Sequence, residues 1–348
     1  MAVDAESVLE VAEAWCSAGQ RVAWATVVST WRSSPRPLGS QLLIAEDGRF
    51  AGSVSGGCVE GAVIQAASEL FRGGVAQTLA YGVSSEAAWE VGLPCGGKIE
   101  IFLSELERPL LDRLLAARRA RSTLACLTDL GSRQQELWAP GQASELLRQN
   151  QTLGEAVAQA FADEENQIVE QGGQRLFVQL WAAPLRLVVI GAVHLTQVLG
   201  ELAGPFGFEL IVVDPRTAFA TSERFPQATL LHDWPDLALA RLGLDRRSAV
   251  VVLSHDAKLD EPALVAALRS DCFYVGALGS QRTQQARRRR LAEEGVSEAM
   301  LARIHGPIGL DIGALTTPEI AVAILAEIIQ VRRNAARAPR AASSGRAG

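Results

Sequence analysis

Residues 185–215 read LRLVVIGAVHLTQVLGELAGPFGFELIVVDP and carry the clearest indication of the fold. Residues 185–192 are almost continuously apolar, which is typical of a strand covered on both faces of its sheet. Apolar residues at helical spacing follow over 194–207, and a second apolar run occupies 208–215. A strand, a helix and a strand in this order predict a βαβ unit with parallel strands.

The same alternation continues downstream. Strands are expected at 248–256 and 272–280, a helix from about Pro262 to Ser270, and a closing helix at 318–333. The fold class is therefore α/β, with a Rossmann-like, doubly wound parallel sheet over residues 184–333. The small, polar and basic residues 334–348 are expected to be a disordered tail.

Residues 1–183 mix the two kinds of element without regular alternation, which predicts an N-terminal α+β domain. The expected elements are helices at 8–19, 59–71 and 109–121, strands at 21–31, 76–82 and 98–106, and a hairpin at 41–52 that turns at Asp47-Gly48. Between 122 and 181 the pattern is weaker, with strands at 123–130 and 176–182 around a polar middle.

The loop after the first Rossmann strand departs from the dinucleotide-binding pattern. That pattern needs three glycines at G-x-G-x-x-G and an acid at the end of the second strand. Gly191 supplies the first glycine and Asp214 the acid, but Val193 and Thr196 occupy the other two positions. We therefore expect a Rossmann-like domain that does not bind NAD(P) in the usual way, since a branched Val193 keeps a phosphate from the helix N-terminus.

Two further loops end strands on the edge where such folds bind ligands. One is 254–256, Ser-His-Asp, and the other is GALGS, in which Gly276 and Gly279 free the backbone and Ser280 donates to an anion. A plain turn with Ser280 as the helix N-cap is the alternative.

A third cluster, HGPIGLDIG, begins at His305 and includes Asp311, and its density of glycine with titratable residues favours a functional loop. The four arginines 287–290 are expected to form a solvated helix face.

The N-terminal half carries a second glycine-rich loop, GSVSGGCVEG, residues 52–61. The loop precedes and opens a helix, so its backbone amides can converge on an anion. Cys58 stands beside the helix N-terminus, where the dipole lowers a thiol pKa and makes a thiolate accessible. A buried, inert cysteine is the alternative.

Cys95, between a proline and the glycines Gly96 and Gly97, is the second thiol in a setting of this kind. Cys16, Cys126 and Cys272 lie in apolar patterns and are expected in the core. Five scattered cysteines without a CxxC pair argue against a disulfide framework and against a zinc site.

Composition excludes several classes of protein. The net charge of -6 argues against a nucleic-acid binder. No apolar run is long enough to cross a bilayer, and the acidic start MAVDAESVLE is unlike a secretory signal. We expect a cytoplasmic protein without a nucleic-acid or membrane partner.

Several long motifs in one order resemble the XdhC/CoxI family, accessory proteins of molybdenum hydroxylases of the xanthine dehydrogenase type. The N-terminal motifs are GSVSGGCVEGAV and YGVSSEAAWEVGLPCGGKIEIF, and the C-terminal ones are VVDPR, VVLSHDAKLDEPAL, FYVGALGSQRT and ARIHGPIGLDIGA. The family usually reads GAGH after its Rossmann strand, whereas this chain has Gly191-Ala192-Val193-His194.

The resemblance implies binding of the molybdenum cofactor (molybdopterin), its protection, its sulfuration with a cysteine desulfurase, and its insertion into an apo hydroxylase. We also expect a homodimer. It implies Cys58 and Cys95 near the molybdenum, and cofactor contacts from Ser55, Gly56, Gly57, Cys58, Glu60, Cys95, Gly96, Gly97, Gly191, Asp214, Gly276, Gly279, Ser280, His305 and Asp311. An NAD(P)-dependent oxidoreductase and a persulfide-carrying sulfur-transfer protein remain as alternatives.

Overall fold

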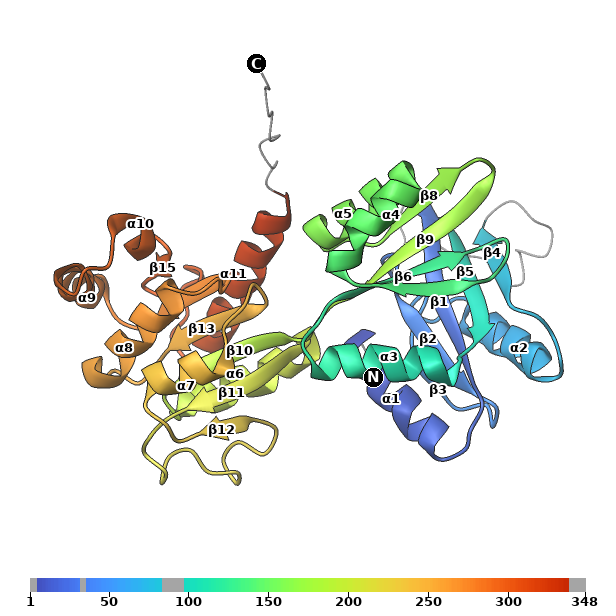
Figure 1. Ribbon diagram of the computed structural model, residues 1–348. Coiled ribbons are helices and arrows are strands. Elements are labelled where there is room, and N and C mark those ends of the chain that lie inside the picture. The colour runs from blue at the N-terminus through green and yellow to red at the C-terminus, as the bar shows by residue number, and fades with distance from the viewer. Residues whose placement is uncertain (1–4, 32–35, 83–96, 338–348) are drawn as a thin grey trace, which may run out of the picture. The chain divides into compact units, whose positions relative to one another are not determined.

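A computed structural model describes residues 5–31, 36–82 and 97–337 (Figure 1). The chain divides into two compact units, Met1–Ala183 and Pro184–Gly348. No helix in the described ranges is both long enough and apolar enough to span a membrane.

The N-terminal unit is built on a five-stranded sheet with antiparallel neighbours, in the order β3-β2-β1-β5-β4. Its strands are β1 (Val22–Trp31), β2 (Gln41–Ala45), β3 (Phe50–Gly52), β4 (Gln77–Gly82) and β5 (Lys98–Glu105). The expected hairpin is β2-β3, and Gly48 in its turn has a φ of 87°. Glycine adopts this left-handed backbone without the steric cost of a side chain.

Helices cover both faces of this sheet. Alternate residues of β1 point to opposite faces, so β1 contributes side chains to two separate clusters. Ala23, Ala25 and Val27 share a buried cluster with helix α2 (Glu60–Phe71). Trp24 belongs to a second cluster, which includes residues of helices α1 (Ala5–Ser17) and α3 (Arg108–Arg119).

A smaller antiparallel sheet, in the order β7-β6-β9-β8, completes the unit. Its strands are β6 (Leu124–Asp129), β7 (Gln135–Trp138), β8 (Gln167–Gln171) and β9 (Gln174–Trp181). The polar middle, to which the sequence pattern assigned no element, contains a short 3-10 turn (Pro140–Gln142) and two helices, α4 (Ala143–Gln149) and α5 (Gln151–Asp163). Leu153, Val157 and Ala160 fix α5, since they lie on one face and pack against the sheet.

The C-terminal unit contains a six-stranded parallel sheet in the order β12-β11-β10-β13-β14-β15. The strands are β10 (Leu185–Ile190), β11 (Phe208–Val213), β12 (Thr229–Leu231), β13 (Ser248–Val252), β14 (Tyr274–Ala277) and β15 (Ile304–His305). Numbered within the unit, this is the order 3-2-1-4-5-6 of the dinucleotide-binding fold. The predicted Rossmann-like sheet is confirmed.

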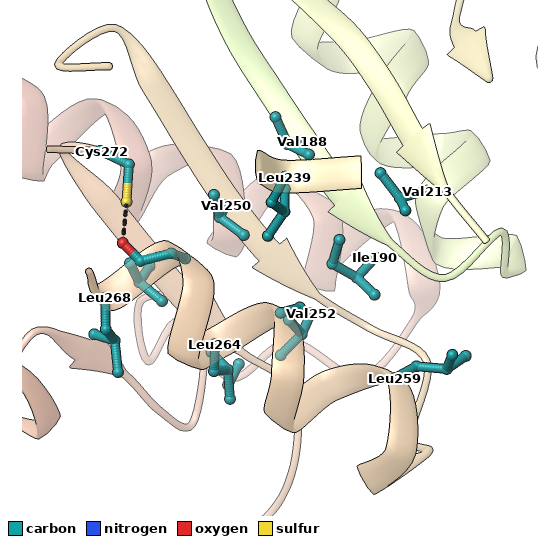
Figure 2. Close-up of a cluster of buried hydrophobic side chains, with 14 of the residues drawn as sticks. Val188, Ile190, Val213, Leu239, Val250, Val252, Leu259, Leu264, Leu268 and Cys272 are labelled. Carbon is teal, nitrogen blue, oxygen red and sulfur yellow. Dashed lines mark hydrogen bonds between the residues drawn. The ribbon is translucent and has the colours of Figure 1, made fainter. Parts of the chain in front are cut away.

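Helices cover both faces of the sheet, which explains the continuous apolar runs in its central strands. Val188 and Ile190 face one cluster, shown in Figure 2 with residues of α7 (Pro235–Leu242) and α8 (Ala257–Leu268). Leu187 and Val189 face the other, which includes residues of α6 (His194–Ala203) and α11 (Thr317–Arg337). The remaining elements are a 3-10 turn (Gly204–Phe206), α9 (Gln281–Glu293) and α10 (Glu298–Leu301).

Two expected boundaries in this unit were wrong. Helix α8 begins at Ala257 rather than near Pro262, because the Asp256 side chain accepts a hydrogen bond from the Lys258 amide at 3.0 Å and caps the helix. Helix α11 continues to Arg337, so the first four residues of the expected disordered tail are helical. Residues 338–348 lie outside the described ranges.

Candidate functional site

The glycine-rich loop of the N-terminal unit surrounds one carboxylate, that of Glu60, the first residue of α2. Its oxygens accept hydrogen bonds from the hydroxyls of Ser53 and Ser55 and from the amides of Val54, Ser55, Gly56 and Gly57. The Ser53 hydroxyl lies 2.7 Å away and the Gly57 amide 2.9 Å away. The amides converge on an anion, as the glycine pattern predicts, but that anion belongs to the chain itself.

The charge of Glu60 is held by these donors. The residue is 8% exposed, and burial alone opposes ionisation. The hydrogen bonds from the two serines and the loop amides outweigh burial and lower the pKa of Glu60 to about 2. Gly56 and Gly57, with φ of 79° and 118°, give the loop the backbone that this arrangement needs.

Cys58 lies in this loop two residues before α2 begins, and it is half-buried against the adjoining apolar cluster. Cys95 and Gly96 lie outside the described residues, and Gly97 is buried just before β5. Among the described residues, no three histidine, cysteine, aspartate or glutamate side chains gather as a metal-ligand group. Cys126 and Cys272 are buried and Cys16 is half-buried against the core.

In the C-terminal unit, the loops after β10 and β13 meet at the point where the strand order reverses. Gly191 has a φ of 106°, and a Cβ placed on it would lie 2.9 Å from the backbone of Ser254. Glycine is therefore required here by its backbone conformation and by its neighbour Ser254. Thr196, at the third glycine position of the pattern, is fully buried, and its hydroxyl donates to the Gly191 carbonyl at 2.6 Å. Val193 has an extended backbone and packs partly on the apolar cluster beneath α6.

Asp214, at the position of the ribose-binding acid, is fully buried and paired. One of its oxygens accepts from the Ala192 amide at 2.8 Å, and the Arg216 guanidinium contacts both oxygens at 2.9 and 2.7 Å. Burial opposes ionisation, but these hydrogen bonds prevail and lower the pKa of Asp214. Arg216 in turn lies over the Phe219 ring, 4.6 Å from its centroid.

The GALGS segment divides between strand and turn. Gly276 does not loosen a loop: it lies inside β14, where a Cβ would come within 2.6 Å of the Tyr274 ring. Gly279 does occupy the turn, with a φ of 140°. The Ser280 hydroxyl accepts from the Thr283 amide at 3.2 Å, so Ser280 is the N-cap of α9. The N-cap role is the alternative that the sequence also allowed for Ser280.

The expectation of a solvated arginine face was wrong for Arg287. Its side chain is 5% exposed and pairs with the buried Asp260 at 3.3 Å, while also donating to the Leu278 carbonyl and to Gln284. The Ser254 hydroxyl donates to the other Asp260 oxygen at 2.6 Å. Burial raises the pKa of Asp260, against the opposing effect of the Ser254 hydroxyl. Spacing along α9 did not reveal this pairing, because Asp260 lies on α8.

His305, at the end of β15, belongs to a group that sequence spacing did not reveal. Its Nδ1 lies 3.2 Å from Glu327 of α11, and its ring stacks on Tyr274 with centroids 4.7 Å apart. The same carboxylate accepts from the Tyr274 hydroxyl at 2.5 Å and the Gly309 amide at 2.8 Å. Burial and the Glu327 carboxylate raise the pKa of Tyr274. Asp311, the other titratable residue of this motif, is exposed.

Comparison with known proteins places both units in one family. The family described as "XdhC Rossmann domain" matches residues 187–328, and the family described as "XdhC and CoxI family" matches residues 15–82. The chain is 30% identical to the molybdenum cofactor insertion chaperone PaoD of Escherichia coli (strain K12), over 94% of this chain and 89% of that protein. The chain belongs to the XdhC/CoxI family.

Two further similarities extend along nearly the whole chain. A probable xanthine dehydrogenase subunit of Bacillus subtilis (strain 168) is 29% identical over 90% of this chain and 93% of that protein. A crystal structure described as a xanthine dehydrogenase from Bacillus halodurans aligns over 97% of this chain and 98% of its own, with a TM-score of 0.75. At 24% identity, that structure supports the fold.

Proposed function

We propose that this XdhC/CoxI protein binds the molybdenum cofactor and inserts it into an apo molybdenum hydroxylase of the xanthine dehydrogenase type. The observation that carries the proposal is the similarity to the insertion chaperone PaoD along nearly the whole chain. In this role the protein protects the cofactor and supports its sulfuration by a partner cysteine desulfurase. It acts as a homodimer in the cytoplasm and has no turnover of its own.

We place the cofactor contacts of the N-terminal unit at the loop of residues 52–61. The cofactor carries a phosphate and a dithiolene-bound metal, so its host uses anion-binding amides and polarisable groups. Because Glu60 holds the amides of residues 54–57, a phosphate at this loop has to displace that carboxylate. Cys58 is a half-buried thiol of the same loop, and we assign it to the metal or its sulfur ligand, together with Cys95.

The second candidate, an NAD(P)-dependent oxidoreductase, is less well supported. A dinucleotide needs the acid at the end of the second strand for its ribose hydroxyls. In this chain the Asp214 carboxylate is fully buried and bonded to Arg216 and Ala192. The unit therefore has the Rossmann topology, but its Asp214 carboxylate is not free to accept hydrogen bonds from a ribose.

Cofactor content tests the proposal directly. Protein purified anaerobically from cells that make molybdenum cofactor should release a fluorescent pterin after acid iodine oxidation, in near-stoichiometric amount. The control is the same protein from cells in which pterin cofactor synthesis is blocked. A trace yield, both from the first preparation and after reconstitution with free cofactor, would refute cofactor binding.

Activation of the client tests the assigned thiol. Cys58→Ser should reduce the hydroxylase activity restored per mole of accessory protein, while circular dichroism shows an unchanged fold. Cys16→Ser is the matched control, because Cys16 is also half-buried but lies in α1 against another cluster. Wild-type activation by Cys58→Ser would remove Cys58 from the site.

A further inference from the structure

A small cavity lies inside the N-terminal unit, on the face of the first sheet opposite α2. Trp24 and Thr26 of β1 face it, and Gln41 of β2 stands directly opposite Thr26 in the antiparallel register. Residues of α3 and of the second sheet, among them Cys126 and Trp181, complete the wall. The cavity has a volume of about 20 Å³.

Two of the side chains around this cavity carry buried polar atoms without a partner. The indole Nε1 of Trp24 and both the oxygen and the nitrogen of the Gln41 amide have no hydrogen bond within the described part of the chain. Trp24 is 6% exposed and Gln41 only 3%. Leaving a buried donor or acceptor unpaired is costly, so native proteins satisfy such atoms with protein groups or with ordered water.

Two other glutamine side chains that line the cavity donate hydrogen bonds to protein groups. The need for a further hydrogen-bond partner therefore concerns Trp24 and Gln41. Gln135 donates to the Thr128 hydroxyl at 3.2 Å, and Gln179 donates to the Gly39 carbonyl at 3.4 Å. Trp24 is held in place by the Trp181 ring, which meets it edge to face with centroids 5.1 Å apart. The unpaired indole N–H and the Gln41 amide therefore belong to the lining of the same cavity.

The lining decides the chemistry of an occupant, and the volume decides its size. Every side chain that lines the cavity is uncharged, with amides, hydroxyls, a thiol and two indoles among apolar groups. An ion would find no counter-charge there, so the occupant is neutral. A water molecule needs about 10–15 Å³ measured in this way and two to four polar partners, so the cavity accommodates about one or two waters.

We propose that this cavity is a built hydration site, in which ordered water accepts hydrogen bonds from Trp24 Nε1 and Gln41 Nε2 and donates to Gln41 Oε1. The water joins β1 to β2 beneath the cluster that α3 covers. It explains a glutamine in a strand whose five residues are all buried. The inference is independent of the proposed cofactor role.

Nuclear magnetic resonance of protein labelled with ¹⁵N at tryptophan tests the site. The indole proton of Trp24, assigned with Trp24→Phe, should show a cross-peak to long-lived water in the wild type. Gln41→Met, which keeps the length of the side chain but removes the amide, should abolish that cross-peak. Gln135→Met is the matched control, since Gln135 lines the same cavity but already has a partner, and it should leave the cross-peak intact.

A crystal structure of the wild type provides a second measurement, which does not depend on whether a variant folds. It should show water density within hydrogen-bond distance of Trp24 Nε1 and the Gln41 amide. A dry cavity would overturn the proposal. A Gln41 amide paired with a protein group, or a Trp24 indole proton without a water cross-peak in the wild type, would do the same.

Discussion

Glu60 Oε2 accepts a hydrogen bond from the Gly57 amide at 2.9 Å, so the first residue of α2 closes the loop that leads into the helix. The negative carboxylate also lies at the positive end of the helix dipole. A loop rich in glycine and serine is thereby given one fixed shape by a single side chain. The shape depends on the charge of that side chain.

Replacing this charge should weaken the N-terminal unit, particularly at neutral pH. Glu60→Gln is expected to lower the free energy of unfolding by about 2 kcal/mol, since hydrogen bonds to a charged acceptor are lost and an amide donor is introduced. Because the pKa of Glu60 falls from 4.5 to about 2 on folding, its contribution is complete above pH 4.5 and is lost as the pH falls toward 2.

Denaturant unfolding between pH 3 and pH 7, followed for both proteins, measures this dependence. The difference in stability between wild type and Glu60→Gln should shrink as the solution is acidified. Glu69→Gln, on the exposed side of the same helix, is the control and should change little. A difference that does not vary with pH would contradict the assigned role of the carboxylate.

A methyl group on residue 191 should destabilise the contact between the loops that follow β10 and β13 in the Rossmann-like unit. Gly191→Ala is expected to lower the free energy of unfolding by more than about 2 kcal/mol, because a left-handed backbone is strained and the Cβ meets Ser254 at 2.9 Å. Gly73→Ala separates the two effects, since Gly73 has a similar φ of 100° but open space around it. Equal losses for the two variants would show that the contact with Ser254 is unimportant.

Two obstacles to NAD(P) binding can be distinguished by calorimetry. The wild type should give no measurable binding of NAD or NADP. If the engaged carboxylate is the obstacle, Arg216→Ala should gain affinity by releasing Asp214. If the branched side chain is the obstacle, Val193→Gly should gain it instead. Micromolar binding by the wild type would contradict both explanations and favour the oxidoreductase alternative.

The hydroxyl of Tyr274 and the carboxylate of Glu327 should be energetically coupled. Tyr274→Phe is expected to cost about 1–2 kcal/mol, as the loss of one hydrogen bond to a charged acceptor. Glu327→Gln should cost more, because the Gly309 amide loses the same acceptor. A double-mutant cycle on the free energy of unfolding should give a coupling of about 1 kcal/mol. Additive losses would argue against the pairing.

The fold was predictable where a local pattern reflects the sheet directly. Residues 185–190 are apolar at nearly every position because β10 is covered on both faces, and that signal is visible without any tertiary information. Helix α5 was missed because the residues on either side of it are rich in Gln and Glu, although its own sequence is largely apolar. Leu153 and Val157 are nevertheless four positions apart, which is a helical spacing.

The candidate site was less predictable, because its contacts join residues that are distant in sequence. The loop at 52–61 stood out by its glycines, and the structure adds that Glu60 is the anion its amides hold. Tyr274 and Glu327 are separated by 53 positions and follow no motif, so only the fold brings them to His305. Arg287 was misassigned for the same reason, since its partner lies on another helix.

The strand order also determines when the second unit can assemble during synthesis. Strand β10 lies between β11, which follows it closely along the chain, and β13, whose Ser248 pairs with Arg186 across 62 positions. On a ribosome, β10 and β11 can pair first, and one edge of β10 stays open until β13 emerges. An open edge of an apolar strand is a template for wrong pairing. The nascent chain therefore exposes this apolar edge from the emergence of β11 until the emergence of β13.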